Sequence, residues 1–376
     1  MRRYKLFILL SLCLYVFHSC GVKDLSDENF IDFAMKIEKE IMNYENENPI
    51  IYAFDYEEFE KRVLTGLEIS KKDRNRASKF IREHTKPAVS IMESVKNGAN
   101  FRFVKFYRNG NEPHVIFRTY FNGGVSLEDW TLGVKKGQIR IYDAFAIVSG
   151  INWSDDCRQK LCNYLDFITD EVFRINNLIE VNYFISNEEY DTADSLLYWI
   201  LPQKYDDLYA RTMELNLASL NKSYENVQFL AENFEKTFPS QRAIYTFYLM
   251  QSSIRHGLAD ETTTHIHALI SLIGDDPIYY VYQSWSYQYA NANVYALQML
   301  DSAIRYMPHI FDLYLNKLDI YYSDYDYQSC VNLLYEMDTL FESGGEGDAV
   351  FFKLNYPQLI GYEPFIKWIQ SKGKTT

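Results

Sequence analysis

Apolar residues recur every three or four positions through the first part of the chain. Phe30, Ala34, Ile37 and Ile41 fall on one helical face, and similar spacings continue to residue 96. Amphipathic helices are therefore predicted over 27–44, 56–67, 73–85 and 87–96.

The hydrophobic period changes to two at Phe101. Four strands are predicted, over 101–107, 114–121, 127–134 and 139–148. Glycine-containing pairs that favour hairpin turns separate them, at Asn109-Gly110, Gly123-Gly124 and Lys136-Gly137. Helices followed by a four-stranded antiparallel meander predict an α+β domain with the helices on one face. The polar stretch from Asn152 to Asp156 is interpreted as a hinge.

Helical periodicity returns after this stretch, now in pairs of helices. In the clearest pair, over 277–308, the second helix carries Ala296, Leu300 and Ala303 on one face. The equivalent position in the second helix of each pair is occupied by Ala193, Val227, His265, Ala296 and Cys330. These residues are 34, 38, 31 and 34 positions apart. Two short antiparallel helices cannot bury their apolar faces alone, so each pair needs stacked neighbours.

This pattern resembles the tetratricopeptide (TPR) repeat, in which small residues allow close helix approach and a proline such as Pro308 ends the unit. A non-repeating helical bundle is the alternative. The resemblance implies a mostly α protein, with a TPR-like α-solenoid preceded by the small α+β domain. The predicted organisation is a signal peptide at 1–19, an anchor segment and helix at 20–50, the α+β domain at 51–150, a connecting helix at 151–173, repeats at 174–342, and a linker with a capping helix at 343–376.

The order of helices and strands in the α+β domain also resembles the cystatin-like and nuclear-transport-factor-like cone folds, which often hold a pocket. Asp143 alternates with apolar residues of the last strand and is expected to face inward. A structural pairing with Arg118 or Lys105 is the preferred interpretation. A catalytic acid is the alternative.

The first residues have the pattern of an export signal. A basic head with Arg2 and Arg3 precedes an apolar run over 6–17, which is too short to span a bilayer. Ser19-Cys20-Gly21 is similar to a bacterial lipobox, in which Cys20 is acylated and becomes the mature N-terminus. Ordinary cleavage near Ser19 is the alternative. Lipidation implies a cell-envelope protein anchored in the outer membrane.

The net charge argues against one class of function, and the cysteine spacing argues against a disulfide. The chain has a formal net charge of −13, which disfavours nucleic-acid binding. One basic cluster stands out, at Lys71, Lys72, Arg74, Arg76, Lys79 and Arg82, and it is either a solvated face or a contact with lipid phosphates near the anchor. Cys157 and Cys162 are poorly spaced for a bridge on one helix, so free buried thiols are preferred over a disulfide.

No catalytic or metal-binding motif is present. The chain lacks HExxH, GxSxG, a phosphate-binding loop and CxxC, and its seven histidines are scattered. No enzyme activity, cofactor or metal is therefore expected.

The TPR resemblance implies a concave groove lined by the first helix of each pair. The family positions that line it correspond here to Asn182, Asn216, Met250, Trp285, Gln288, Tyr289, Asp319 and Tyr322. Each of these is either a partner-binding or a packing residue. The cations of the family's carboxylate clamp are missing, because Leu178, Thr212 and Val281 stand among the corresponding positions.

Three functions are compatible with these sequence features. The preferred one is a protein-interaction scaffold that binds an envelope protein or peptide segment. An aromatic groove also suits a glycan. The third is a hydrolase that uses a pocket of the α+β domain.

Overall fold

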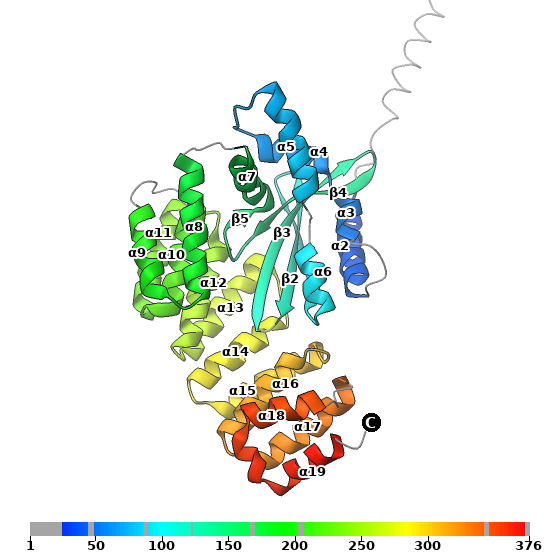
Figure 1. Cartoon of the computed structure of the whole chain (residues 1–376), viewed down its shortest axis with the longest axis vertical. Coiled ribbons are helices and arrows are strands. Elements are labelled where there is room, and N and C mark those ends of the chain that lie inside the picture. The colour runs from blue at the N-terminus through cyan, green and yellow to red at the C-terminus, as the bar shows by residue number, and fades with distance from the viewer. Residues whose placement is uncertain are drawn as a thin grey trace, which may run out of the picture.

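The computed structural model describes residues 25–43, 49–85, 89–121, 123–165, 170–201, 207–341 and 346–372. The chain is mostly helical, with an antiparallel sheet in its N-terminal part, as the sequence predicts (Figure 1). The predicted signal peptide and the predicted lipidation site at Cys20 lie outside the described residues.

Within its described residues, the N-terminal part combines five helices with a meander sheet. The helices are α2 (Asp27–Met42), α3 (Pro49–Ala53), α4 (Tyr56–Leu64), α5 (Lys71–His84) and α6 (Val89–Lys96). The strands are β1 (Asn100–Asn109), β2 (Glu112–Phe121), β3 (Gly124–Lys135), β4 (Gln138–Ala146) and β5 (Ile151–Asn152), paired in that order.

The short fifth strand corrects two expectations. The sheet has five strands instead of four, because Asn152 pairs with Phe145. A two-residue strand is too short to produce a periodic signal. The residues predicted as a hinge belong to regular elements, since Asn152 ends β5 and Trp153 begins a helix. Just before them, Gly150, at φ +70°, packs so closely that a Cβ there would lie 2.5 Å from Thr212 Oγ1. Helix α7 (Trp153–Tyr164) follows directly.

Both faces of the sheet are buried, which corrects the expectation that helices cover only one. Val115, Phe117 and Trp130 pack with the N-terminal helices on one face. Ile116, Tyr120 and Leu127 point the other way and join the core of the later helices. The alternation along β2 and β3 therefore separates two hydrophobic cores.

The remaining helices form an array of antiparallel pairs beside and below the sheet in Figure 1. Its helices are α8 (Asp170–Ser186), α9 (Tyr190–Ile200), α10 (Leu208–Asn221), α11 (Tyr224–Thr237), α12 (Arg242–Arg255), α13 (Ala259–Ile273), α14 (Ile278–Tyr289), α15 (Asn293–Tyr306), α16 (Phe311–Ser323) and α17 (Tyr327–Phe341). Ala296, which the sequence places at a helix contact, is fully buried.

The same turn joins the two helices of four pairs. One residue in each turn has a positive φ, at Glu188, Gly257, Asn291 and Tyr325. The next residue donates its N–H to a carbonyl five residues earlier, as in Glu189 N to Phe184 O at 2.9 Å and Ala292 N to Tyr287 O at 2.8 Å. This hydrogen bond is that of the Schellman motif. The turns at Gly257, Asn291 and Tyr325 are each separated by 34 residues.

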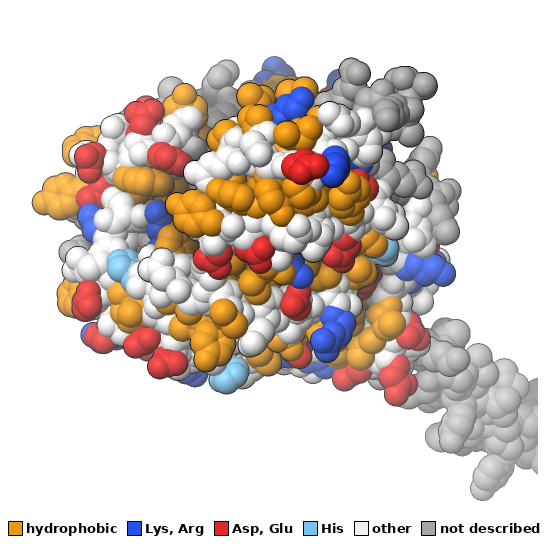
Figure 2. Space-filling model, turned by 90° about the horizontal axis from the view of Figure 1, so that it is seen from below, with side chains coloured by type: hydrophobic (Ala, Val, Ile, Leu, Met, Phe, Trp, Pro, Cys, Tyr) orange, Lys and Arg blue, Asp and Glu red, His pale blue; other side chains and the backbone are white. Residues whose placement is uncertain are grey.

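The C-terminal residues close the array. Phe365 and Trp368 of α19 (Glu363–Lys372) are buried, and Trp368 Nε1 donates to Asp338 of α17 at 2.7 Å. Helix α18 (Glu346–Asn355) and the 3-10 turn η2 (Pro357–Gly361) precede it, and α18 occupies part of the stretch predicted as a linker. Figure 2, which views this end of the molecule, shows hydrophobic side chains in a row across it.

Polar contacts join the sheet to the array. Arg118 of β2 is fully buried and pairs with Asp276, in the connection between α13 and α14, with Nε 3.1 Å from Oδ1. Lys105 Nζ of β1 donates to the carbonyl oxygens of Ser271 and Leu272, at 3.2 and 3.0 Å, at the C-terminal end of α13. A cation at this end of a helix satisfies carbonyls that have no partner within the helix.

Neither of these cations pairs with Asp143, which corrects that expectation. The Asp143 carboxylate accepts the Ser154 hydroxyl at 2.5 Å and the Ser154 and Ala144 amides at 3.1 and 2.9 Å. Asp143 thus holds the first turn of α7 against β4. Cys157, Cys162 and Cys330 are buried, and none of them is in a disulfide among the described residues.

Candidate functional site

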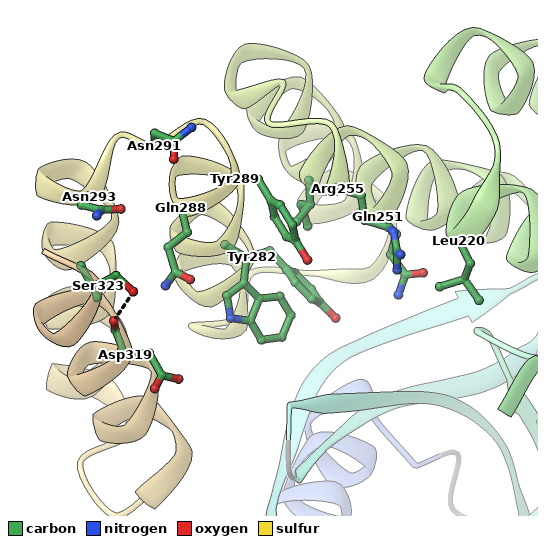
Figure 3. A pocket seen from close by; sticks show the side chains of 13 residues that line it. Leu220, Gln251, Arg255, Tyr282, Gln288, Tyr289, Asn291, Asn293, Asp319 and Ser323 are labelled. Atoms are coloured by element: carbon green, nitrogen blue, oxygen red, sulfur yellow. Dashed lines mark hydrogen bonds between the residues drawn. The ribbon is translucent and has the colours of Figure 1, made fainter. Parts of the chain in front are cut away.

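A cavity of about 610 Å³ opens on the array, between helices of successive pairs. It is lined from α12 by Gln251, Ile254 and Arg255 and from α14 by Tyr282, Trp285, Gln288 and Tyr289. The other lining residues are Leu220 of α10, Asp319, Ile320 and Ser323 of α16, Asn291 of the α14–α15 turn, and Asn293, which begins α15 (Figure 3). The first helices of four successive pairs therefore contribute to one concave surface.

The cavity brings together four of the eight residues proposed from the sequence, namely Trp285, Gln288, Tyr289 and Asp319. Asn182 is exposed on α8, and Asn216 is half-buried on α10; neither lines the cavity. Tyr322 packs edge-on against Tyr356, with ring centroids 5.1 Å apart, so C-terminal residues contact it.

Met250 is misplaced in the sequence-based alignment. Its side chain is fully buried, and the next residue, Gln251, lines the cavity instead. Successive side chains on a helix differ by about 100° in direction, so an error of one residue exchanges a groove position for a core position. The α12–α13 and α14–α15 turns are 34 residues apart, so Gln251 corresponds to Trp285. The sequence-based alignment placed His265 opposite Ala296, whereas the buried residue 34 positions before Ala296 is Thr262.

Aromatic rings form one wall of the cavity. Trp285 is half-buried and meets Tyr282 edge-on, with ring centroids 5.6 Å apart. Tyr289 stands at the rim and is 59 % exposed. In Figure 3, Tyr282 and Tyr289 extend from α14 toward Gln251 and Arg255 of α12. The wall can therefore provide stacking and edge contacts to a ligand.

Close helix packing fixes the position of this wall. Gly257, at φ +63° in the α12–α13 turn, touches the next turn, and a Cβ there would lie 2.9 Å from Ala290 N and 3.0 Å from Tyr289 O. A side chain at Gly257 would push the end of α14, with Tyr289, away from α12.

Hydrogen-bond donors are available around the rings. Gln288 Nε2 is buried and has no hydrogen-bond partner among the described residues. Arg255 is exposed and forms no ion pair in the described part of the chain. An unpaired buried donor is costly, so an acceptor brought by a ligand would relieve that cost.

The acidic side of the cavity is held in place by the C-terminal residues. The Tyr356 hydroxyl donates to Asp319 Oδ1 at 2.7 Å. Although Asp319 as a whole is exposed, desolvation of its carboxyl group beside Tyr356 raises the pKa of Asp319. Ser323 donates to the Asp319 carbonyl at 2.7 Å, the bond drawn in Figure 3.

No group of three or more potential metal ligands occurs among the described residues. The cavity lining contains no histidine, cysteine or lysine, and its one carboxylate is already hydrogen-bonded to Tyr356. Such a lining is suited to binding and lacks the paired nucleophile and base of a covalent mechanism.

Within the described residues, no helix is both long enough and apolar enough to cross a bilayer. Comparison of the chain with protein-family models, with curated proteins and with solved structures gives no match.

Proposed function

We propose that this protein is a non-enzymatic lipoprotein of the cell envelope, anchored through Cys20 in the outer membrane, whose TPR-like array binds an extended peptide segment of an envelope protein. The observation that carries the proposal is the cavity, since one concave surface runs across the first helices of four successive pairs. A surface built from parallel helices at regular intervals fits an extended chain better than a compact ligand.

The lining chemistry supports a peptide. Gln251 and Gln288 can exchange hydrogen bonds with a peptide backbone, which presents a carbonyl and an N–H in each residue. Trp285 and Tyr282 can pack against its side chains. The unpaired Gln288 Nε2 is the donor for which a backbone carbonyl is the natural partner.

Crosslinking in intact cells, followed by affinity purification, tests the proposal. The crosslinked segment of the partner is then synthesised, and its dissociation constant is measured with the purified chain. We expect Trp285→Ala to weaken binding about 30-fold, because an aromatic contact at the centre of an interface often contributes about 2 kcal/mol. Gln288→Ala is a second cavity variant that removes little hydrophobic volume.

Trp199→Ala is the matched control, because Trp199 is 57 % exposed on α9, outside the cavity lining. It should bind the peptide like the wild type. Since Trp285 is half-buried, Trp285→Ala should also cost about 1–3 kcal/mol of stability, less than a fully buried aromatic. Equal affinity of both cavity variants and the wild type would contradict a peptide site here.

A glycan is the second candidate, because the cavity combines aromatic rings with four side-chain amides. Affinity electrophoresis through gels containing polysaccharides separates the two candidates. Retardation that is lost in Trp285→Ala and kept in Trp199→Ala would favour the glycan.

A further inference from the structure

Helix α5 exposes a concentration of positive charge. Ala77, Phe80 and Ile81 are its buried residues, and its other positions face the solvent or are half-buried. The exposed positions include six cations, of which Arg76 pairs with Asp73 at 3.2 Å and Lys79 with Glu83 at 3.7 Å. The other four, at Lys71, Lys72, Arg74 and Arg82, form no ion pair in the part of the chain that the structure describes.

This arrangement is unfavourable for the helix itself. Lys71 and Lys72 lie in the first turn of α5, where the helix dipole favours negative charge. Lys71 and Arg74 are three residues apart, as are Lys79 and Arg82, so like charges are neighbours on the helix surface. Helix stability therefore does not account for the cations at the start of α5, although Arg82 lies in the last turn, where the dipole favours positive charge. The chain is otherwise strongly acidic.

Helix α5 lies at the end of the molecule where the described chain begins. Figure 1 shows α4 and α5 together at the upper end of the molecule. Leu25 borders the same hollow as Glu112, which pairs with Arg62 of α4 at 2.8 Å, and α4 packs against α5. Five residue steps separate Cys20 from Leu25, and these span at most about 18 Å.

We propose that α5 rests on the membrane and binds anionic lipid headgroups through Lys71, Lys72, Arg74 and Arg82. The orientation at the membrane rests on the proposed lipid anchor at Cys20, whereas the headgroup binding itself does not require the anchor. The anchor would supply attachment, and α5 would set which face meets the lipid. The peptide-binding cavity on α12, α14 and α16 lies further down the molecule, so this orientation leaves it open to a partner (Figure 1).

Vesicle co-sedimentation tests the proposal with a chain that begins at Gly21, because this chain keeps every described residue and has no lipid. Vesicles of phosphatidylglycerol and phosphatidylethanolamine in equal parts are compared with vesicles of phosphatidylcholine alone. We expect binding to the anionic vesicles only. The binding should disappear at about 1 M NaCl, where the Debye length is about 3 Å.

Matched charge reversals locate the binding surface. The variant Lys71→Glu/Lys72→Glu/Arg74→Glu should lower the vesicle-bound fraction at least about tenfold, because each cation near an anionic surface contributes to binding. The control Lys236→Glu/Arg305→Glu/Lys353→Glu changes exposed cations of the helical array by the same total charge and should bind like the parent. Circular dichroism confirms that both variants fold.

Three outcomes would overturn the proposal. One is equal loss of binding in the two triple variants, which would mean a non-specific charge effect. Another is equal binding to both kinds of vesicle. The third is absence of vesicle binding together with a Lys71- and Lys72-dependent association with an acidic protein. None of these results depends on the cavity, so the test is independent of the peptide-binding experiment.

Discussion

Arg118 and Asp276 form a buried ion pair that joins β2 of the sheet to the start of α14, the helix that carries Trp285. The Arg118 guanidinium donates two further hydrogen bonds to Asn100, one to its side-chain oxygen at 2.7 Å and one to its backbone carbonyl oxygen at 3.1 Å. Asp276 Oδ1 also accepts the Ile278 amide at 2.9 Å. The cavity is therefore built on a helix whose first turn is fixed to the sheet.

Removing one partner of this ion pair should lower the free energy of unfolding. Arg118→Met leaves the buried Asp276 carboxylate with only the more distant and half-exposed Arg102, and we expect a loss of about 3–5 kcal/mol in the free energy of unfolding. Chemical denaturation measures it. Arg102→Met is the control, because Arg102 is more exposed and lies 3.7 Å from Asp276; it should cost about 1 kcal/mol or less. Equal losses in the two variants would show that the Arg118 pair is not the important contact.

The contact between α15 and its neighbours should not tolerate a larger side chain. Ala296 is fully buried in a small cluster with Leu300 and Ile320. Ala296→Leu should destabilise the protein by about 1–3 kcal/mol through overpacking. Gln298→Leu, at an exposed position two residues along the same helix, should change stability by about 0.5 kcal/mol or less. Similar melting temperatures for these two variants would argue against the close helix approach.

Stability should depend on the ionisation of Glu128 in β3. Burial raises the pKa of Glu128 from its ordinary value of 4.5 to about 7, although Trp130 Nε1 donates to its carboxylate at 2.9 Å. The folded protein then binds a proton more tightly than the unfolded chain, so stability should fall as pH rises from about 4.5 to 7. We expect Glu128→Gln to reduce that fall by about 1–3 kcal/mol.

Denaturant titrations at several pH values measure this effect. Glu38, Asp143 and Asp319 also have raised pKa values because of desolvation, so the difference between Glu128→Gln and the wild type is the informative quantity. Glu93→Gln, at an exposed position, is the control and should keep the wild-type slope. A Glu128→Gln slope identical to that of Glu93→Gln would refute the assignment.

Cys20→Ala should move the protein from the membrane fraction to a soluble exported pool. The expected reason is loss of the acyl chains, which fix a lipoprotein to the bilayer through hydrophobic burial. Fractionation is carried out after a high-salt wash, which also releases any contact through α5. A variant that still pellets with membranes after a further carbonate wash would show that the anchor does not depend on Cys20.

The element types could largely be predicted because hydrophobic periodicity records which face of each element is buried. The second covered face of the sheet was missed, although the signal was present. Val115, Ile116 and Phe117 form an unbroken apolar run in β2, and such a run indicates a strand covered on both sides. Helix α18 was missed because the glycines around Gly345 suggested a flexible segment.

The candidate site was only partly predictable, because repeat alignment fixes side-chain direction only where the interval is regular. Trp285, Gln288, Tyr289 and Asp319 come from units that follow the 34-residue interval, and they line the cavity. Met250 comes from the unit that the sequence alignment placed with steps of 38 and 31, and its side chain points into the core. The contact of Tyr356 with Asp319 joins residues 37 apart through tertiary packing, which no local pattern records.

Because one sheet contributes to two hydrophobic cores, the chain cannot be cut between the sheet and the helical array without exposing apolar surface. The boundary near residue 150 separates two architectures, but Ile116, Tyr120 and Leu127 on one side of it complete the core of the helices on the other. A fragment ending there would expose one apolar face of its sheet to water, and a fragment starting there would lack the surface on which α12 and α14 rest. We therefore expect fragments made by recombination or gene fusion at this point to expose apolar surface and to aggregate.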